Sequence, residues 1–230
     1  MEKVPMGIPE LDDLLRGGLP RNSICLLAGG PGTGKTILGA QFLYAGAIKY
    51  NENGLLVTFG ESQQRFVDFM RTLGWDFQKL IEAKKVAILE MVSVRTKGLA
   101  ATVDMIMEKV REMGAKRLVI DSITAISLAS TERIDTRILV SLVHKSLSTA
   151  GCTTLLVTET PWGSSGIGTG VEEFIADGII LLESFVEGAQ YKRRLAILKM
   201  RGVDHDTRRY KYMITRENGI TVIPYPEATI

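Results

Sequence analysis

The residues best suited to chemistry form a glycine-rich loop near the start of the chain. It reads Gly29-Gly30-Pro31-Gly32-Thr33-Gly34-Lys35-Thr36 and matches the spacing G-x-x-x-x-G-K-[ST] in full. Glycines permit backbone angles that turn successive N–H groups toward one anion, and a following helix adds a favourable dipole. In such loops the lysine neutralises the β- and γ-phosphates, and the threonine hydroxyl binds Mg²⁺. The loop therefore predicts a site for ATP and Mg²⁺.

A carboxylate at the end of an apolar run supports the same ligands. Residues 117–121, Arg-Leu-Val-Ile-Asp, have the composition of a buried strand that ends in Asp121. Alone, such an aspartate is more often a helix N-cap, here with Ser122 beside it. In proteins with a phosphate loop, however, this aspartate holds Mg²⁺. We therefore expect Thr36 and Asp121 to form the metal site.

Hydrolysis of ATP also needs an oriented water molecule, and a carboxylate can accept its proton. Glu61 is the candidate, because it follows a strand expected at residues 55–59. It should emerge at the carboxyl edge of the sheet, where open α/β folds bind ligands. An ordinary glutamate in the first turn of a helix explains the same pattern equally well.

The elements that must position these residues alternate along the chain, which predicts a mostly parallel sheet flanked by helices. Strands are expected at 23–28, 55–59, 86–91, 117–121 and 153–158, and helices at 36–50, 63–73, 101–113 and 135–149. After Asp177, closely spaced strands are expected at 179–183, 194–200, 210–214 and 221–223. Their short connections predict antiparallel hairpins at one edge of the sheet. With no long linker, residues 1–230 are expected to form a single α/β domain.

Composition narrows the class of protein. Hydrophobic residues make up 45% of the 230 residues, which suits a globular core, and no apolar run approaches the ~20 residues of a membrane span. No secretory signal is visible, and Cys25 and Cys152 are expected to be small buried hydrophobes rather than a disulfide. We expect a reduced, cytoplasmic protein without membrane insertion. The net charge of +2 is too small to argue for nucleic acid.

Nearly the whole chain resembles a single KaiC-type domain, within the RecA/RadA branch of P-loop ATPases. Besides the phosphate loop, the matching segments are 6–12, 17–20, 41–44, 57–62, 74–76, 119–122, 170–174, 198–202 and His205. The resemblance implies a RecA-like fold with a twisted, mostly parallel sheet. It also implies a Mg²⁺-dependent ATPase that assembles into a homo-oligomer, a hexameric ring with nucleotide at the subunit interfaces.

The resemblance also assigns roles to single residues. Glu61 would orient the attacking water. The family commonly has a second glutamate where this chain has Gly60, which speaks against protein kinase activity. Lys199 and Arg201 would reach the nucleotide of the adjacent subunit as an arginine finger does, whereas a lone K-x-R pattern is usually a solvated strand face. Further nucleotide contacts are expected at Ile37, Thr72, Met200 and His205.

Two features bear on the partner, which the sequence does not identify. Trp162 lies in a glycine- and serine-rich loop that is suited to stacking on a nucleic acid base, or to a subunit contact or disorder. Basic clusters at 192–194 and 208–211 suit phosphate backbones, edge-strand protection or subunit contacts equally well. The leading hypothesis is a regulatory or signalling ATPase. The alternatives are a RadA-paralogue-like DNA-binding recombination accessory protein and an ATP-dependent assembly module with negligible turnover.

Overall fold

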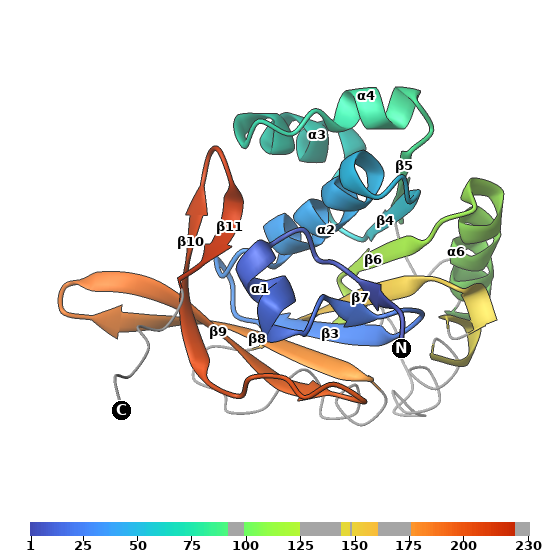
Figure 1. The fold of residues 1–230 in the computed structure, drawn as a ribbon. Helices are drawn as coiled ribbons and strands as arrows, with labels where there is room; N and C mark the ends of the chain where they lie inside the picture. Colours follow the sequence, from blue (N-terminus) through green and yellow to red (C-terminus); the bar gives the residue numbers. More distant parts are fainter. Residues whose placement is uncertain (92–98, 125–143, 148, 161–175, 224–230) are drawn as a thin grey trace.

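A computed structural model describes the chain except for residues 92–98, 125–143, 148, 161–175 and 224–230 (Figure 1). Within the described residues the main sheet has nine strands in the order β11-β10-β9-β8-β3-β7-β6-β4-β5. The strands are β3 (Ile24–Gly29), β4 (Gly54–Thr58), β5 (Val86–Glu90), β6 (Arg117–Asp121), β7 (Thr153–Glu159), β8 (Gly178–Glu187), β9 (Gln190–Met200), β10 (Arg209–Thr215) and β11 (Gly219–Val222).

The direction of the strands confirms the expected fold class. Strands β5, β4, β6, β7, β3 and β8 pair in parallel, and β8, β9, β10 and β11 pair antiparallel at one edge. A separate two-stranded sheet joins β1 (Lys3–Val4) to β2 (Leu19–Pro20). This is the RecA-like arrangement that the sequence predicts.

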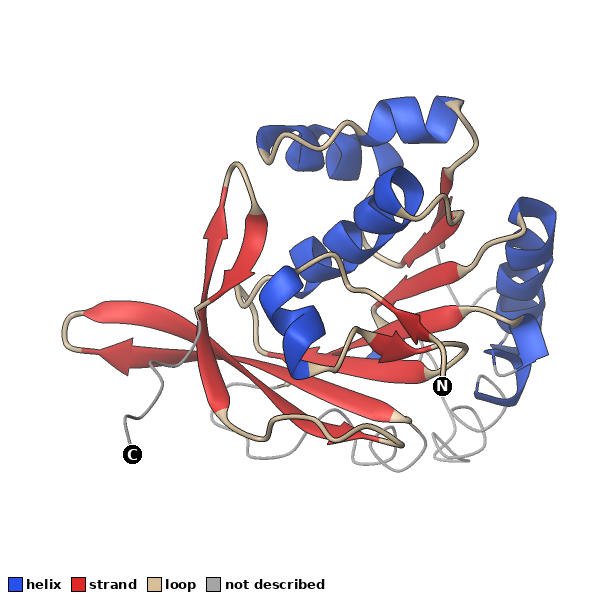
Figure 2. Cartoon of the chain, viewed as in Figure 1, coloured by secondary structure: helices blue, strands red, loops and turns tan. Residues whose placement is uncertain are grey.

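Helices cover both faces of the sheet (Figure 2). The described helices are α1 (Pro9–Leu14), α2 (Lys35–Lys49), α3 (Gln63–Thr72), α4 (Phe77–Glu82) and α6 (Leu99–Met113). Side chains of β3 alternate between two cores, because successive residues of a strand point to opposite faces. Leu27 packs with residues of α1 to α4, and Leu26 packs with residues of α6. None of the described helices is long and apolar enough to cross a membrane.

Most predicted elements lie within one or two residues of the observed ones. The hairpin of β8 and β9 is longer than predicted, because its outer part mixes polar with apolar residues and shows no regular alternation. Cross-strand ion pairs hold it instead, from Arg194 to Glu183 and from Lys192 to Glu187. The short helices α1 and α4 were not predicted, and the helix expected at 135–149 lies largely outside the described residues. Both cysteines are buried and free, as expected.

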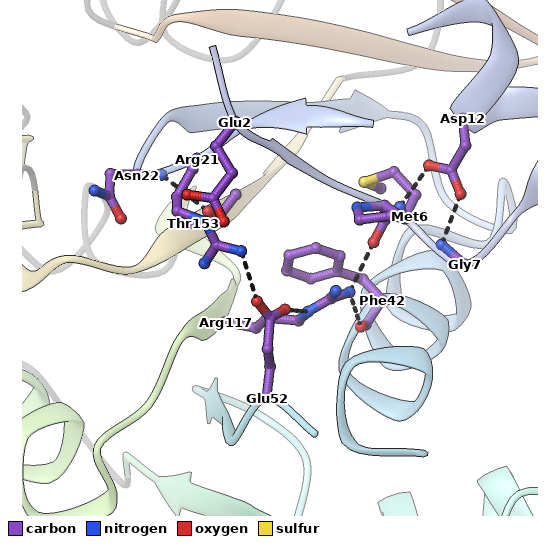
Figure 3. A network of polar contacts seen from close by, with 11 residues as sticks. Glu2, Met6, Gly7, Asp12, Arg21, Asn22, Phe42, Glu52, Arg117 and Thr153 are labelled. Carbon is purple, nitrogen blue, oxygen red and sulfur yellow. Dashed lines mark hydrogen bonds and ion pairs between the residues drawn. The ribbon is translucent and has the colours of Figure 1, made fainter. Parts of the chain in front are cut away.

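A buried arginine ties the start of the sheet to the N-terminal segment (Figure 3). Arg117, at the first position of β6, has a fully buried side chain and pairs with Glu52 at 2.7 Å. Its guanidinium donates to the carbonyls of Pro5 and Phe42 and lies 4.6 Å from the centre of the Phe42 ring. Glu52 also accepts from Arg21 at 2.9 Å. A buried charge needs this degree of pairing to be tolerated.

The network predicts that Glu52→Gln destabilises the fold strongly. The change leaves the Arg117 guanidinium buried without its counter-charge, so we expect the free energy of unfolding to fall by about 3 kcal/mol. Urea denaturation followed by circular dichroism measures this. Glu112→Gln is the control, because Glu112 pairs with Lys109 on the surface of α6 and should change stability by less than about 0.5 kcal/mol.

The effect should depend on pH in a definite direction. Burial acts to raise the pKa of Glu52, but hydrogen bonds from Arg117 and Arg21 outweigh it, and the pKa lies below its ordinary value of 4.5. A pKa lowered by folding means that the stabilisation is present above the ordinary value and is lost as the pH falls through the folded-state value. The stability difference between wild type and Glu52→Gln should therefore be constant near neutral pH and shrink below pH 4.5. Equal stability of the two proteins at neutral pH would contradict the role of the network.

Candidate functional site

The glycine-rich loop connects β3 to α2 at the carboxyl edge of the sheet. Strand β3 ends at Gly29 and α2 begins at Lys35. Gly32 and Gly34 have φ angles of 74° and 89°, a left-handed conformation that side chains other than glycine rarely adopt. A Cβ atom at Gly32 would meet nothing within 4 Å, so that side of the loop is open. The loop thus has the backbone shape of an anion cradle at the N-terminus of a 15-residue helix.

Lys35 folds back over this cradle. Its Nζ donates to the carbonyl oxygens of Gly29 at 2.8 Å and Gly30 at 2.9 Å. Burial lowers the pKa of Lys35, while the charges of Asp121 and Glu159 act to raise it. A bound phosphate would offer this ammonium group a charged partner in place of two neutral carbonyls.

Thr36 and Asp121 meet across the same edge. The Thr36 hydroxyl donates to Oδ2 of Asp121 at 2.7 Å, although the two residues are 85 positions apart. Burial raises the pKa of Asp121, against the hydrogen bond from Thr36 and the charge of Lys35, which lower it. A hydroxyl and a carboxylate are the hard oxygen ligands that Mg²⁺ prefers, with water and phosphate completing its shell. Among the described residues, no three His, Cys, Asp or Glu side chains lie close enough together to hold a metal ion by themselves.

Glu61 lies in the loop after β4, on the same edge. Thr58 is paired in register with Asp121, and the Glu61 N–H donates to the Thr58 hydroxyl at 3.2 Å. Ser62 is the N-cap of α3, so Glu61 stands outside the helix and is not a first-turn residue. Its side chain is 31% exposed and 3.8 Å from Arg65. The carboxylate therefore remains partly open to solvent beside the strand ends.

Lys199 and Arg201 lie together near the amino ends of the parallel strands, at the opposite end of the strands from the phosphate loop. Met200, between them, pairs with Gly178, and Gly178 pairs with Cys25 at the start of β3. Lys199 donates to the Ala176 carbonyl at 2.6 Å, and Arg201 pairs with Asp177 at 3.2 Å. Strand β3 rises about 3.3 Å per residue, so these cations are more than about 13 Å from their own phosphate loop. The structure brings the pair together but not to Lys35 of the same chain.

The other expected nucleotide contacts are scattered. Ile37 is buried in the first turn of α2, and the side chain of Met200 is packed inside the core. The Thr72 hydroxyl donates to the Phe69 carbonyl at 2.7 Å at the end of α3. His205 lies beyond β9, with Nδ1 3.2 Å from the Val203 carbonyl. Among the described residues, neither Thr72 nor His205 forms a hydrogen bond with the phosphate loop.

Two residues of the antiparallel strands donate hydrogen bonds to the loop, and neither was predicted from the sequence. Arg193 on β9 donates to the Gly32 carbonyl at 3.1 Å, and the Tyr212 hydroxyl on β10 donates to the Thr33 carbonyl. The only sequence signal was the basic cluster at 192–194, which pointed equally to nucleic acid, edge protection or subunit contacts. Pairing across 161 and 179 positions has no local signature.

Most of the remaining basic side chains in these strands have acidic partners. Lys192 and Lys211 both pair with Glu187, and Arg208 pairs with Asp206. Intramolecular pairing of this kind favours edge protection over a phosphate-backbone site. Trp162, its glycine-rich loop and the segment 170–174 lie outside the described residues.

The sequence of this chain is similar to known proteins over nearly its whole length. The family model described as "ATPase: KaiC" matches residues 4–227. A UPF0273 protein of Methanocaldococcus jannaschii is 34% identical over 100% of this chain and 99% of its own length. The circadian clock oscillator protein KaiC of Synechococcus elongatus is 36% identical over 94% of this chain, which spans 43% of that longer protein.

A solved structure of a KaiC-like protein has the same fold as this chain. The crystal structure of a KaiC-like protein from Pyrococcus horikoshii superimposes with a TM-score of 0.89 and is 38% identical, covering 97% of this chain and 99% of that one. With the loop, the parallel sheet and the antiparallel edge in place, the chain belongs to the KaiC family of RecA-like P-loop ATPases.

Proposed function

We propose that this protein binds ATP with Mg²⁺ and hydrolyses it slowly as a cytoplasmic, single-domain regulatory or signalling ATPase. The observation that carries the proposal is the meeting of Thr36 and Asp121 at 2.7 Å beside the Lys35 ammonium group. Three groups of the types that hold a magnesium nucleotide thus converge at one helix N-terminus. Membership of the KaiC family supports the same activity.

In the proposed site, Lys35 binds the β- and γ-phosphates and the loop N–H groups hold their oxygens. Thr36 and Asp121 hold Mg²⁺, which would neutralise charge on the phosphates. Glu61 orients a water molecule for attack on the γ-phosphate and accepts its proton, a role that its position at the same sheet edge and its partial exposure permit. Gly60 leaves no second carboxylate at this place, which favours water over a protein hydroxyl as the acceptor.

We further propose a homo-oligomeric ring, hexameric as the family resemblance implies, in which Lys199 and Arg201 serve the neighbouring nucleotide. Their position at the edge of the sheet opposite the phosphate loop supports this, because they lie too far from their own site. A cation supplied by a neighbour stabilises negative charge in the transition state and makes activity depend on assembly. His205 and Met200, on the same segment, would lie at the same interface.

Removing the charges of Lys35 and Asp121 one at a time should distinguish phosphate binding from Mg²⁺ binding. Lys35→Ala should abolish detectable ATP binding, because the phosphates lose their buried counter-charge. Asp121→Asn should retain weak binding and lose its dependence on Mg²⁺, since one ligand of the ion loses its charge. Titration of a fluorescent ATP analogue with and without Mg²⁺ measures both. Lys79→Ala, an exposed lysine on α4, is the control and should bind ATP normally. Normal binding by Lys35→Ala would refute the site.

Glu61→Gln should separate binding from hydrolysis. The amide keeps the size of the side chain but cannot accept a proton, so we expect turnover to fall by about a hundredfold or more while ATP affinity is kept. Release of phosphate measured by an enzyme-coupled assay tests this. Glu90→Gln is the control for the loss of a nearby carboxylate. Glu90 accepts a hydrogen bond from the Gln63 N–H at the start of α3, so this variant should keep the wild-type turnover. Unchanged turnover in Glu61→Gln would assign the base elsewhere.

The role of Arg201 in trans can be tested by mixing two inactive proteins. Glu61→Gln subunits keep Arg201, and Arg201→Ala subunits keep Glu61, so only mixed rings contain complete sites. A random mixture should recover about a quarter of the wild-type rate, since one interface in four combines both intact groups. Light scattering with and without Mg²⁺ and ATP measures the size of the assemblies. If the mixture stays inactive although mixed rings form, Arg201 does not act on the neighbouring site.

A further inference from the structure

A cavity lies along the second half of α2, apart from the phosphate loop at the start of that helix. It has a volume of about 440 Å³ and is bounded by the segment before α1, the second half of α2, Trp75 and the turn between β10 and β11. Its lining residues on α2 run from Gln41 to Lys49, and no residue of the phosphate loop lines it. A volume of this size is within the range of small-molecule sites in proteins.

One wall of the cavity is aromatic and firmly held. The rings of Tyr44 and Trp75 stack with their centres 5.7 Å apart. Trp75 is buried and packs so closely on Gly219 that a Cβ atom there would lie 2.4 Å from the indole ring. Aromatic faces attract organic cations and cover the aliphatic stems that carry them.

The charged residues of the lining have no partners among the described residues. Three charged residues are among those that line the cavity, the half-buried Glu10 and the exposed Glu217 and Lys49. None of the three takes part in an ion pair or side-chain hydrogen bond within the described parts of the chain. Oε2 of Glu10 is buried and receives no hydrogen bond there. A buried carboxylate oxygen without a donor is costly, and a cation in the cavity would supply the missing charge.

We propose that this cavity binds a basic amino acid, with its two cationic groups on Glu10 and Glu217 and its α-carboxylate on Lys49. The charges match in number and sign, since the ligand carries two positive groups and one negative group and the lining carries the reverse. Its aliphatic stem would lie along Tyr44 and Trp75. This proposal does not rest on ATP hydrolysis.

The ligand preference is tested by titration calorimetry of the full chain with three related compounds. L-Arginine or L-lysine should bind saturably to one site. L-Citrulline, which replaces the guanidinium by a neutral urea of the same shape, should bind at least about tenfold more weakly. Agmatine, which lacks the carboxylate, should also bind more weakly. No saturable binding up to about 10 mM of either basic amino acid, or equal binding of citrulline, would overturn the proposal.

Variants assign the contacts. Glu10→Gln should weaken binding of L-arginine about tenfold, whereas Asp13→Asn, an exposed carboxylate on the same helix that does not line the cavity, should leave it unchanged. Lys49→Met should weaken binding of L-arginine but not of agmatine, and because Lys49 is exposed the variant should fold normally. Equal effects of Glu10→Gln and Asp13→Asn, or a Lys49→Met effect on agmatine as large as on L-arginine, would also overturn it.

One further pair of measurements separates this cavity from the nucleotide site. Lys35→Ala should lose ATP binding and keep L-arginine binding, whereas Glu10→Gln should keep ATP binding and weaken L-arginine binding. Displacement of L-arginine by saturating ATP and Mg²⁺ would show that the cavity is part of the nucleotide site, and would overturn the inference of a second site.

Discussion

The parallel register of β3, β7, β6 and β4 is the constraint on which the rest of the structure depends. Parallel strands present all their carboxyl ends at one edge, and backbone hydrogen bonds hold the offset between neighbours. The pairing of Thr58 with Asp121 and of Gly29 with Glu159 places strand ends that are distant in sequence beside one another. A one-residue slip of β6 would point the Asp121 side chain to the other face of the sheet. The contact between Thr36 and Asp121 is therefore a consequence of sheet pairing.

Because of this register, the residues that stabilise β6 lie at its start and the candidate site residue lies at its end. Arg117 is the first residue of β6, and its guanidinium donates hydrogen bonds to the Glu52 carboxylate and to the carbonyls of Phe42 and Pro5. At the carboxyl edge, Asp121 closes the same strand, where burial raises its pKa and only one described hydrogen bond satisfies it. One five-residue strand thus carries at its start a buried charge that is paired through Nε and Nη1, and at its end a carboxylate with a single described hydrogen bond. A site that binds a metal needs the second kind of environment, and the first kind keeps the strand in place.

Features that depend on a few neighbouring residues could be predicted from the sequence, whereas contacts between residues distant in sequence could not. The loop, Lys35 and the ends of β3 and β6 follow from short patterns, because glycine angles and apolar runs act over a few residues. The contacts of Arg193 and Tyr212 with the loop depend on where β9 and β10 pair, which no local pattern states. The sequence placed Arg117 at the start of an expected strand but did not indicate its ion pair with Glu52, 65 residues earlier. The roles expected for Lys199 and Arg201 came from family resemblance alone, since the isolated K-x-R pattern is usually a solvated strand face.

Strand β9 gives a physical route between adjacent sites in the proposed ring. Near its start, Arg193 holds the Gly32 carbonyl of its own phosphate loop. At its end, Lys199 and Arg201 lie beside Ala176 and Asp177, about 20 Å away at 3.3 Å per residue. The strand pairs with β8 as far as Met200 and with β10 from Arg193 to Ala196, so its neighbours support it from the Arg193 end onward. If its far end meets the nucleotide of a neighbour, a shift of that end on loss of the γ-phosphate would be transmitted to the loop of its own subunit. Coupling between sites would then be a property of one strand, and a monomer would lack it.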